Sequence, residues 1–467
     1  MSIMKITFNA AILGLLLFTN ATYAQQPTAG RGICGTVAPS AEWEAWFQTK
    51  ITELNSNYQR DRAIVYIPVI VHVIYNKQTI GVGANLKAGQ VQAQIDVLND
   101  CLAGITPGNS SLPSPFAAVD ADDIPVRFCL ATVSPTGAVL DEKGIERIDV
   151  SKKGWTDPAT IQGPSNSSKI QNLFTNTIKP GSIWDPTKYF NIWVGDFWDP
   201  VAGGLLGYAT FPAGAGISGI VDNLGTAKND GVVMASNIFG SKTKFSNGYY
   251  TNRDEFNYGI TVAHEVGHWL GLRHISGDNS CGDDYCSDTP PQKGGHDGCA
   301  NGLNWGCPSY PYQANQCKDN NGKGLNPNGE MFQNYMDYTN DNCRSLFTAE
   351  QEKRILTALA NGTYRKGFTT AANSLCSVPT TIKEQAAANS VAIYPNPSSG
   401  IFTVESLSNE LLQIQVYDFI GQLVYKTENG NATNKKEIDL SELPNGMYSI
   451  QILNGSIFSS SLISINK

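Results

Sequence analysis

The sequence of 467 residues is poor in histidine, in charge and in long hydrophobic runs. Charged residues make up 16% of the chain, and the 41 acidic side chains outnumber the 33 basic ones. The chain therefore lacks the excess of basic residues that binds a nucleic-acid phosphate backbone. Nucleic-acid binding is therefore not expected as the main role. Beyond residue 24, no stretch reaches the roughly 18 consecutive apolar residues of a membrane-spanning helix. Hydrophobic residues still make up 41% of the chain, which excludes wholesale disorder and suffices for two or three cores.

Residues 1–24 have the composition of a secretory signal peptide. Lys5 precedes an apolar run, and the segment ends at Ala24 with small residues where a signal peptidase requires them. A membrane anchor is the alternative. Residue 25 is Gln and not Cys, so lipid attachment at a new N-terminus is not supported. We expect an exported protein that is either released or held at the cell surface.

Ten cysteines fit an oxidising compartment. Six of them lie between Cys281 and Cys343, in a stretch rich in Gly, Asn, Asp and Pro where we expect loops. Because such a stretch has little core of its own, two or three disulfides are expected there. The spacing alone fixes no pairing, although Cys101 with Cys129 is a plausible bridge.

Hydrophobic periodicity predicts an α/β or α+β domain with a mixed sheet, followed by a small all-β domain. His72 falls inside the first strand and is interpreted as a core histidine. Asp254 or Asn257 is available to cap the third helix. The expected helices are 42–54, 87–99, 257–270 and 349–360, and the expected strands are 67–75, 126–133, 190–197 and 207–211. Short strands at about ten-residue spacing then predict a β-sandwich over 391–467.

The eleven-residue string HEVGHWLGLRH begins at His264. On a helix, His264 and His268 share one face and can present two imidazoles to one metal ion, while Glu265 can hold a water beside it. Gly271 can take the left-handed conformation that ends a helix, so that His274 approaches as a third ligand. Three nitrogens with an open fourth position is the arrangement of catalytic zinc. By chance, the His-Glu-x-x-His part alone is expected about 0.005 times in this chain, so the motif is specific.

This string matches the long zinc consensus of the metzincin metalloproteases. That family also has a methionine-bearing turn beneath the metal, and NYMDY around Met336 is similar to it. Together with SDTP from Ser287, these motifs resemble the pappalysin family of metzincins over roughly residues 31–368. The resemblance implies an α+β catalytic domain with a mixed twisted sheet, active-site and backing helices and a loop-rich lower subdomain. It also implies a zinc endopeptidase that acts on proteins or peptides.

Zinc would polarise the scissile carbonyl and acidify its bound water, and Glu265 would act as general base and pass the proton to the leaving amine. The resemblance implies that Tyr338, two residues after Met336, supports the oxyanion. Met336 itself would form a hydrophobic seat under the metal. Pappalysins often favour Arg or Lys after the cleaved bond, read by an acidic group beyond the methionine turn, which assigns Asp341 to substrate binding.

Residues 25–62 form a separate block that we interpret as a propeptide, with an ordinary surface helix as the alternative. An Arg or Lys preference would explain self-cleavage at Arg60 or Arg62. The segment RGICGT around Cys34 resembles the Cys-Gly-Thr segment by which pappalysin zymogens place a thiolate on the zinc. The resemblance predicts latency through Cys34, whereas an ordinary disulfide half is the rival interpretation. If Cys34 stays single, one further cysteine, such as Cys376, must be unpaired as well.

The acidic tract 281–290 carries hard oxygen donors on a loop, which suits calcium. The resemblance implies a structural calcium held by the side chains of Asp284 and Thr289, with the carbonyls of Asp283 and Ser287 nearby. Two extra cysteines and a long insertion depart from the commoner family pattern. A solvated acidic loop is therefore the alternative.

The tail segments YPNP from Tyr394, GIF from Gly400 and LPNGMY from Leu443 resemble the C-terminal sorting domain of the type IX secretion system of Bacteroidetes bacteria. This implies periplasmic export, partnership with that secretion machinery, and removal of the tail or its exchange for a surface anchor. A substrate- or carbohydrate-binding β-module is the alternative.

The leading hypothesis is a secreted zinc endopeptidase made as a latent zymogen. The alternative is a surface binding protein on a catalytically degenerate metzincin scaffold, which intact Glu265 and Tyr338 argue against. The methionine turn disfavours a zinc hydrolase of other amides. The expected organisation is a signal peptide (1–24), a propeptide (25–62), a catalytic domain (63–368), a linker (369–390) and a sorting domain (391–467).

Overall fold

The structure is a computed structural model that describes most of the chain beyond residue 31. The described residues are 32–55, 64–105, 112–199, 201, 203–214, 224–251, 254–294, 307–313, 316–368, 375–376, 391–406, 412–418, 422–427, 435–454 and 457–467. The expected signal peptide, the processing residues Arg60 and Arg62, and most of the expected linker lie outside them.

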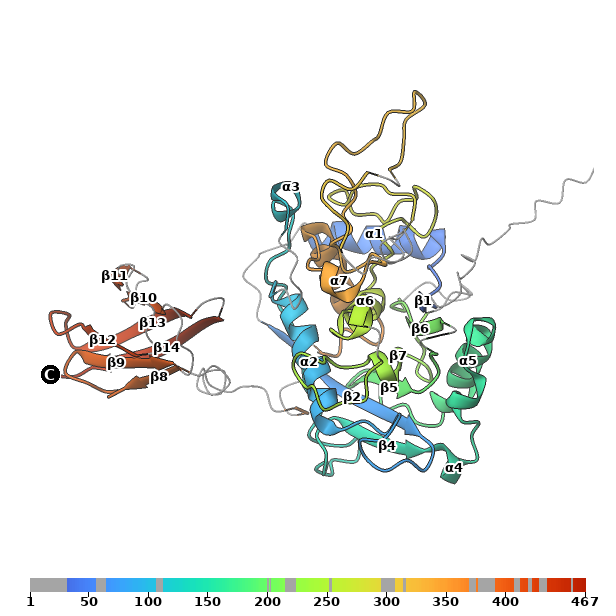
Figure 1. The fold of residues 1–467 in the computed structure, drawn as a ribbon, viewed down its shortest axis with the longest axis horizontal. Helices are drawn as coiled ribbons and strands as arrows, with labels where there is room; N and C mark the ends of the chain where they lie inside the picture. Colours follow the sequence, from blue (N-terminus) through green and yellow to red (C-terminus); the bar gives the residue numbers. More distant parts are fainter. Residues whose placement is uncertain are drawn as a thin grey trace, which may run out of the picture.

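The N-terminal unit contains a mixed seven-stranded sheet, whose strands β2, β4, β5 and β7 lie below α6 (Ile260–Trp269) in the view of Figure 1. The sheet has the order β1-β6-β7-β5-β2-β3, and β4 also pairs with β2. Every pair is parallel except β6 with β7. β2 and β5 are buried on both faces, as their near-continuous apolar sequences predict. The strands are β1 (Gly32–Cys34), β2 (Val65–Tyr75), β3 (Val126–Leu130), β4 (Ile145–Asp149), β5 (Phe190–Gly195), β6 (Gly204–Ala209) and β7 (Val232–Ala235).

Helices cover this sheet, and the four helices expected from periodicity are confirmed, each end lying within three residues of the expected position. The helix α6 lies at the centre of the unit and packs against β6, β7 and α2, whereas α1 packs against α7 (Figure 1). A π-helical turn over Phe174–Ile178 continues α5. The helices are α1 (Ala41–Asn55), α2 (Ala88–Leu102), α3 (Ser114–Ala117), α4 (Val150–Lys153), α5 (Ser167–Leu173), α6 (Ile260–Trp269) and α7 (Ala349–Asn361).

His72 is a core histidine, as the sequence predicts. It is fully buried in β2, where its Nδ1 lies 2.6 Å from the Glu146 carboxylate and its Nε2 lies 2.9 Å from Asn191 Oδ1.

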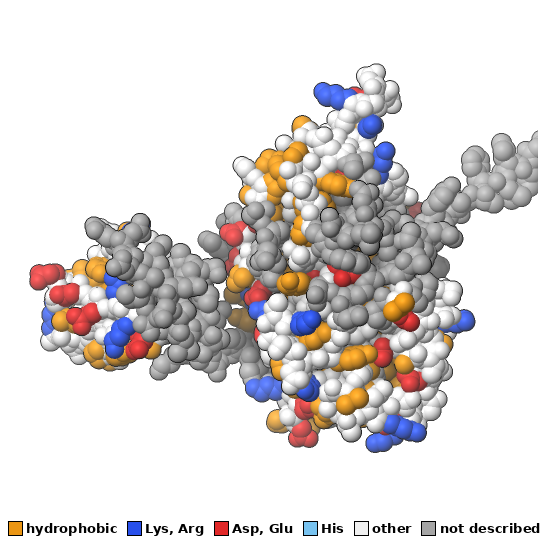
Figure 2. All heavy atoms as spheres, viewed as in Figure 1, with side chains coloured by type: hydrophobic (Ala, Val, Ile, Leu, Met, Phe, Trp, Pro, Cys, Tyr) orange, Lys and Arg blue, Asp and Glu red, His pale blue; other side chains and the backbone are white. Residues whose placement is uncertain are grey.

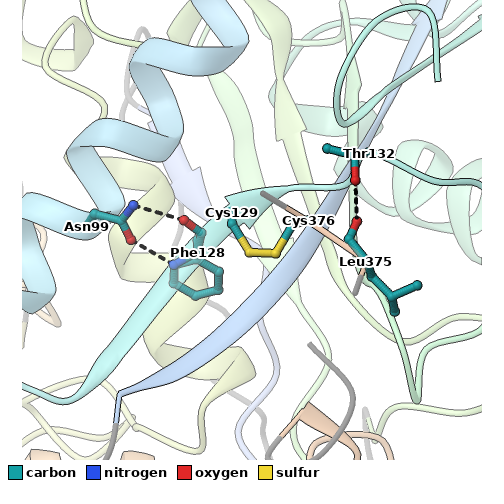
Figure 3. Close-up of a disulfide and its surroundings, with 6 residues drawn as sticks. All are labelled: Asn99, Phe128, Cys129, Thr132, Leu375 and Cys376. Carbon is teal, nitrogen blue, oxygen red and sulfur yellow. Dashed lines mark hydrogen bonds between the residues drawn. A yellow bond between two sulfur atoms is a disulfide. The ribbon is translucent and has the colours of Figure 1, made fainter. Parts of the chain in front are cut away.

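The disulfides correct two expectations. Cys129 pairs with Cys376, so neither the proposed Cys101–Cys129 bridge nor a single Cys376 is right (Figure 3). Cys281 pairs with Cys317 and Cys307 with Cys343, which confirms that the loop-rich stretch is cross-linked. The described cysteines that remain free are Cys34, Cys101 and Cys286.

The Cys129–Cys376 bridge ties the end of the N-terminal unit to β3 (Figure 3). Beside it, Thr132 N donates a 2.8 Å hydrogen bond to Leu375 O. On the other side of β3, the amide of Asn99 in α2 exchanges two hydrogen bonds with the backbone of Phe128. Residues 375 and 376 are therefore tied to the N-terminal unit by a covalent bond and a hydrogen bond.

The C-terminal residues form two antiparallel sheets, as expected for a small β-sandwich. One sheet has the order β11-β10-β13-β14 and the other β12-β9-β8. Their shared core contains Phe402 and Val404 from β9 together with Ile414 and Ile450 from the other sheet. The strands are β8 (Val391–Tyr394), β9 (Ile401–Ser406), β10 (Leu412–Tyr417), β11 (Leu423–Lys426), β12 (Lys435–Asp439), β13 (Gly446–Asn454) and β14 (Ile457–Ile465).

Within the described residues, no helix has the length and apolar character needed to cross a bilayer. On the face drawn in Figure 2, acidic and basic side chains of the described residues are interspersed, and no broad basic patch is visible. This distribution agrees with the net charge of −8.

Candidate metal centre

The helix α6 is apolar apart from its motif residues and Thr261, and all ten of its residues are buried. The helix ends where the sequence predicts, because Gly271 has a left-handed φ of 88°. Leu272 N then donates a 2.9 Å hydrogen bond back to Gly267 O, which closes the last turn. The chain reverses at this point and brings His274 back towards the helix.

Four donor atoms converge beside α6. The Nε2 atom of His268 lies 3.2 Å from Nε2 of His264 and 3.0 Å from Nε2 of His274. The Sγ atom of Cys34, at the end of β1, lies 3.5 Å from Nε2 of His268. All four atoms are within 4.8 Å of one another, so one ion could contact all of them.

The other ring nitrogen of each histidine is held by an oxygen acceptor. Because a carbonyl or carboxylate oxygen accepts a hydrogen there, Nδ1 carries the proton and the Nε2 lone pair points at the common centre. Nδ1 of His264 lies 2.9 Å from Tyr335 O, and Nδ1 of His268 lies 2.8 Å from Leu272 O. Nδ1 of His274 lies 2.5 Å from Asp278 Oδ1.

The donor set fits zinc. Two nitrogens bound tetrahedrally at about 2.0–2.1 Å lie roughly 3.4 Å apart, and such a nitrogen lies roughly 3.5 Å from a thiolate bound at about 2.3 Å. The observed separations of 3.0–3.5 Å are close to these values. Burial also lowers the pKa of His268 to about 3 and that of His264 well below its ordinary value, which favours the neutral imidazole that a metal requires.

Glu265 lies beside this centre and is fully buried. One carboxylate oxygen, Oε2, accepts a 2.8 Å hydrogen bond from the hydroxyl of Thr36, while Oε1 has no hydrogen-bond partner among the described residues. Burial raises the pKa of Glu265 to about 7, against the opposing hydrogen bonds of Cys34 and Thr36. A buried carboxylate with a free oxygen at this position is suited to accept a proton from a polar group held at the centre.

The methionine turn lies directly under α6. A Cβ on Gly267 would meet Met336 Sδ at 2.4 Å, so the helix has no room for a side chain where the buried Met336 packs. Two residues later, the hydroxyl of Tyr338 lies 2.8 Å from Nε2 of His274. The turn therefore brings a phenol to the metal side of the cluster.

Asp341 is fully buried, and its carboxylate is occupied. It accepts hydrogen bonds from the backbone N–H groups of Tyr258 and Ile260 and from the hydroxyl of Thr261. It also forms a 2.6 Å ion pair with Arg344. This carboxylate therefore caps α6 and faces no solvent, so in this structure it is not free to contact a substrate, and its expected role in substrate binding stays a prediction.

The same contacts correct the expected cap of α6. The residue at the N-cap position is Gly259, which has a left-handed φ of 81° and no side chain, so neither Asp254 nor Asn257 takes that position. The capping oxygens come instead from Asp341, about eighty positions further along the chain.

In the acidic loop, Asp284 and Thr289 are brought together. The Thr289 hydroxyl lies 2.8 and 2.9 Å from the two carboxylate oxygens of Asp284, and both residues are buried. Burial raises the pKa of Asp284 to about 7. Asp283 turns its carboxylate to the backbone of Tyr285, and Ser287 is exposed.

Several residues around the centre were not predicted from the sequence. The sequence indicates Thr36 only as part of the Cys-Gly-Thr segment, although its hydroxyl donates a hydrogen bond to Glu265. Asp278 orients His274 from a left-handed backbone conformation with φ of 63°, for which a non-glycine residue gives no sequence signal. Glu44 contacts Arg354, which is 310 positions away, so no local pattern could indicate it.

Comparison with known proteins agrees with this geometry. Residues 174–360 match the family described as pregnancy-associated plasma protein-A, and residues 392–466 match the secretion system C-terminal sorting domain. An extracellular metalloprotease of Verticillium alfalfae is 30% identical over 328 residues, which cover 69% of this chain and 87% of that protein. One of Pyricularia oryzae is 36% identical over 168 residues, 35% of this chain, and the match spans only 47% of that protein.

Two solved structures from Tannerella forsythia are similar to this chain. A promirolysin mutant superposes with a TM-score of 0.53 at 30% identity, covering 74% of this chain and 99% of its own. Mature mirolysin in complex with a cleaved peptide gives a TM-score of 0.50 at 31% identity, covering 68% of this chain and 100% of its own.

Proposed function

The chain belongs to the pappalysin family of metzincin metalloproteases, and from this membership we propose that it is a secreted zinc endopeptidase made as a latent zymogen. The observation that carries the proposal is the convergence of three imidazole Nε2 atoms beside the buried carboxylate of Glu265. A catalytically degenerate scaffold would not be expected to keep the base, the ligands and the orienting acceptors together.

His264, His268 and His274 would hold the zinc ion. When bound, zinc would act as a Lewis acid that polarises the scissile carbonyl and lowers the pKa of a water molecule. Glu265 would take a proton from that water through Oε1 and later deliver it to the leaving amine nitrogen. The phenol of Tyr338, already directed at the cluster, would donate a hydrogen bond to the oxyanion. Met336 would keep an apolar floor under the ligands.

Latency would come from the segment that ends at Thr36. Cys34 Sγ reaches the histidine cluster, Thr36 occupies one oxygen of Glu265, and β1 covers the edge of β6 by pairing with it. An extended peptide substrate would use the same edge for main-chain hydrogen bonds, so β1 would exclude it. The pro form of mirolysin aligns with 74% of this chain and the mature form with 68%, so the pro form matches a larger part of it.

Processing would separate the propeptide block from the catalytic domain by a cut at Arg60 or Arg62. A preference for Arg or Lys after the scissile bond stays part of the proposal, with no recognition residue assigned to it. The catalytic domain would run from residue 63 to the Cys376 tether. The sorting domain would direct export through the type IX machinery before its removal or exchange.

A structural calcium is a further part of the proposal. The paired oxygens of Asp284 and Thr289 support it, because a cation would offset the burial that raises the pKa of this carboxyl. The carbonyls of Asp283 and Ser287 would complete the ligands. Calcium should raise the melting temperature of the chain, and it should fail to do so in Asp284→Asn.

The deciding experiment is cleavage of casein and of peptides containing Arg or Lys by the processed chain. We expect a Glu265→Gln variant to lose activity by about 10²–10⁴-fold, the usual range for loss of a general base. Its zinc content should stay equal to that of the wild type, because Glu265 is not among the ligands. Equal cleavage by the variant would refute the mechanism.

A further inference from the structure

A buried ion cluster that the proposed chemistry does not use holds α1 to the catalytic unit. Glu44 of α1 is 2% exposed, and its carboxylate accepts hydrogen bonds from Arg354 Nη1 at 2.6 Å and Nη2 at 3.0 Å. The same carboxylate accepts a 3.1 Å hydrogen bond from Arg273 Nε. One acidic side chain of α1 therefore faces two guanidinium groups, and together they hold the pKa of Glu44 below its ordinary value although burial opposes this.

Aromatic rings flank this carboxylate on α1. Trp43 and Phe47 stack with ring centroids 4.6 Å apart, and both are fully buried against Phe211 and Ala358 of the catalytic unit. The indole N–H of Trp43 donates a 2.8 Å hydrogen bond to Pro212 O. The contact between α1 and the catalytic unit thus combines one charge with two rings on a single helix face.

Departure of α1 would leave both arginines without this carboxylate. Within the catalytic unit, Arg354 keeps its hydrogen bonds to Gly271 O, and Arg273 keeps its contact with Asp278 at 3.3 Å. The ring of Tyr285 lies 5.3 Å from the Arg273 guanidinium and 5.9 Å from that of Arg354. Arg354 would lose its ion pair with Glu44 while Arg273 would keep Asp278, so the uncovered surface would carry a positive charge that attracts a replacement anion.

We propose that Arg273, Arg354, Phe211 and Ala358 form a second binding site of the processed enzyme, here called the helix site. Its ligand is a helical segment of a protein substrate that carries one carboxylate with aromatic residues one position before it and three positions after it. The inference rests on the proposed function, because it requires that α1 be removed.

The helix site is close to the catalytic centre, which is why the ligand is assigned to substrates. Arg273 precedes the ligand His274 in the sequence, and its Nη1 group contacts the same Asp278 carboxylate that orients His274. A protein bound through such a helix would therefore hold its neighbouring residues within reach of the cleft. A preference of this kind would act on whole proteins and leave short peptides unaffected.

Binding of a labelled peptide of residues 37–55 to the processed full chain tests the helix site. The peptide lacks Cys34 and Thr36, so it cannot occupy the metal centre. Fluorescence anisotropy should detect binding, and a Glu44→Gln peptide should bind at least about tenfold more weakly, because a buried charge pair is lost. The matched control is Glu53→Gln, which removes the same charge from an exposed position and should not change the affinity.

The unprocessed chain should not bind the peptide, since its own α1 covers the site. Absence of binding to the processed chain, or equal binding of the Glu44→Gln peptide, would overturn the helix site. These outcomes are separable from failure of the proposed function. A processed chain that cleaves short peptides but does not bind the helix refutes only the helix site, whereas one that binds the helix but cleaves nothing refutes only the proposed protease.

Discussion

The hydroxyl of Thr36 donates a 2.8 Å hydrogen bond to the Glu265 carboxylate. The hydroxyl oxygen of Thr36 also accepts a 2.8 Å hydrogen bond from the backbone N–H of Ala209 in β6. A single side chain of the N-terminal segment thus joins the expected general base to the edge of the sheet. Because Cys34 reaches the histidine cluster two residues earlier, the segment contacts the base and the ligands together.

Latency can be measured on a chain that cannot be processed. In a background with Arg60→Gln and Arg62→Gln, Cys34→Ser should raise the hydrolysis of a fluorogenic peptide at least tenfold, because a neutral hydroxyl is a much weaker zinc ligand than a thiolate. Electrophoresis of the assayed sample should show the uncut chain. Thr36→Val, which keeps the thiol, should release less activity, and equal latency of all three chains would refute the role of Cys34.

Tyr338→Phe should lower kcat of the processed enzyme by about 10²–10³-fold with little change in KM, as expected for loss of an oxyanion donor. The phenol lies next to His274, so a structural role is the competing explanation. Zinc content measured by mass spectrometry separates the two. Loss of zinc together with activity would assign Tyr338 to holding the site.

Removal of metal by a chelator should abolish activity and lower the melting temperature. Since the three imidazoles converge in the folded chain alone, an ion that binds there stabilises the native state, by about 4 kcal/mol at a thousandfold excess over Kd. Added zinc should restore both properties. A melting temperature unaffected by chelation would contradict a preformed zinc site.

Asp341→Asn should destabilise the fold without altering cleavage preference. The substitution leaves Arg344 buried without its charge partner and weakens the cap of α6, so the free energy of unfolding should fall by about 3 kcal/mol in urea denaturation. A peptide library should give the same residue preferences for both proteins. A changed preference at unchanged stability would restore Asp341 to the substrate site.

Lys179 should make the stability of the chain depend on pH. The Lys179 ammonium group lies against the rings of Trp193 and Tyr208. Burial in this place lowers its pKa from 10.5 to about 7. Between pH 7 and 10.5 the unfolded chain binds this proton more readily than the native chain, so this contribution makes the folded protein more stable as the pH rises. Below pH 7 the full penalty of burying the charged ammonium is present, about 5 kcal/mol.

Lys179→Met removes this titration. The stability of the variant relative to the wild type should therefore be highest near pH 7 and decline by a few kcal/mol towards pH 10.5, as followed by urea denaturation at each pH. Lys169→Met, at an exposed position of α5, is the matched control and should show no such trend. A pH-independent difference for Lys179→Met would contradict the buried titration.

Local patterns were sufficient for the parts of the fold that depend on local physics. The helix that carries His264 and His268, the glycine bend and the buried strand β2 follow from periodicity and backbone preference, and the structure has all three. The disulfide partners did not follow, because pairing depends on where the folded chain brings cysteines 247 positions apart. The burial of Asp341 does not follow from the sequence for the same reason, since burial of a charged side chain is decided by partners such as Arg344 and Tyr258.

The bond between Cys129 and Cys376 closes a loop that contains all three histidines of the centre. A pull applied to the C-terminal sandwich during translocation would enter the catalytic unit at Cys376 and pass through the covalent link into β3 and the neighbouring β2. Tension would then bypass the chain between residues 129 and 376. A force on the C-terminal domain would then not be transmitted through the segment that carries the three histidines.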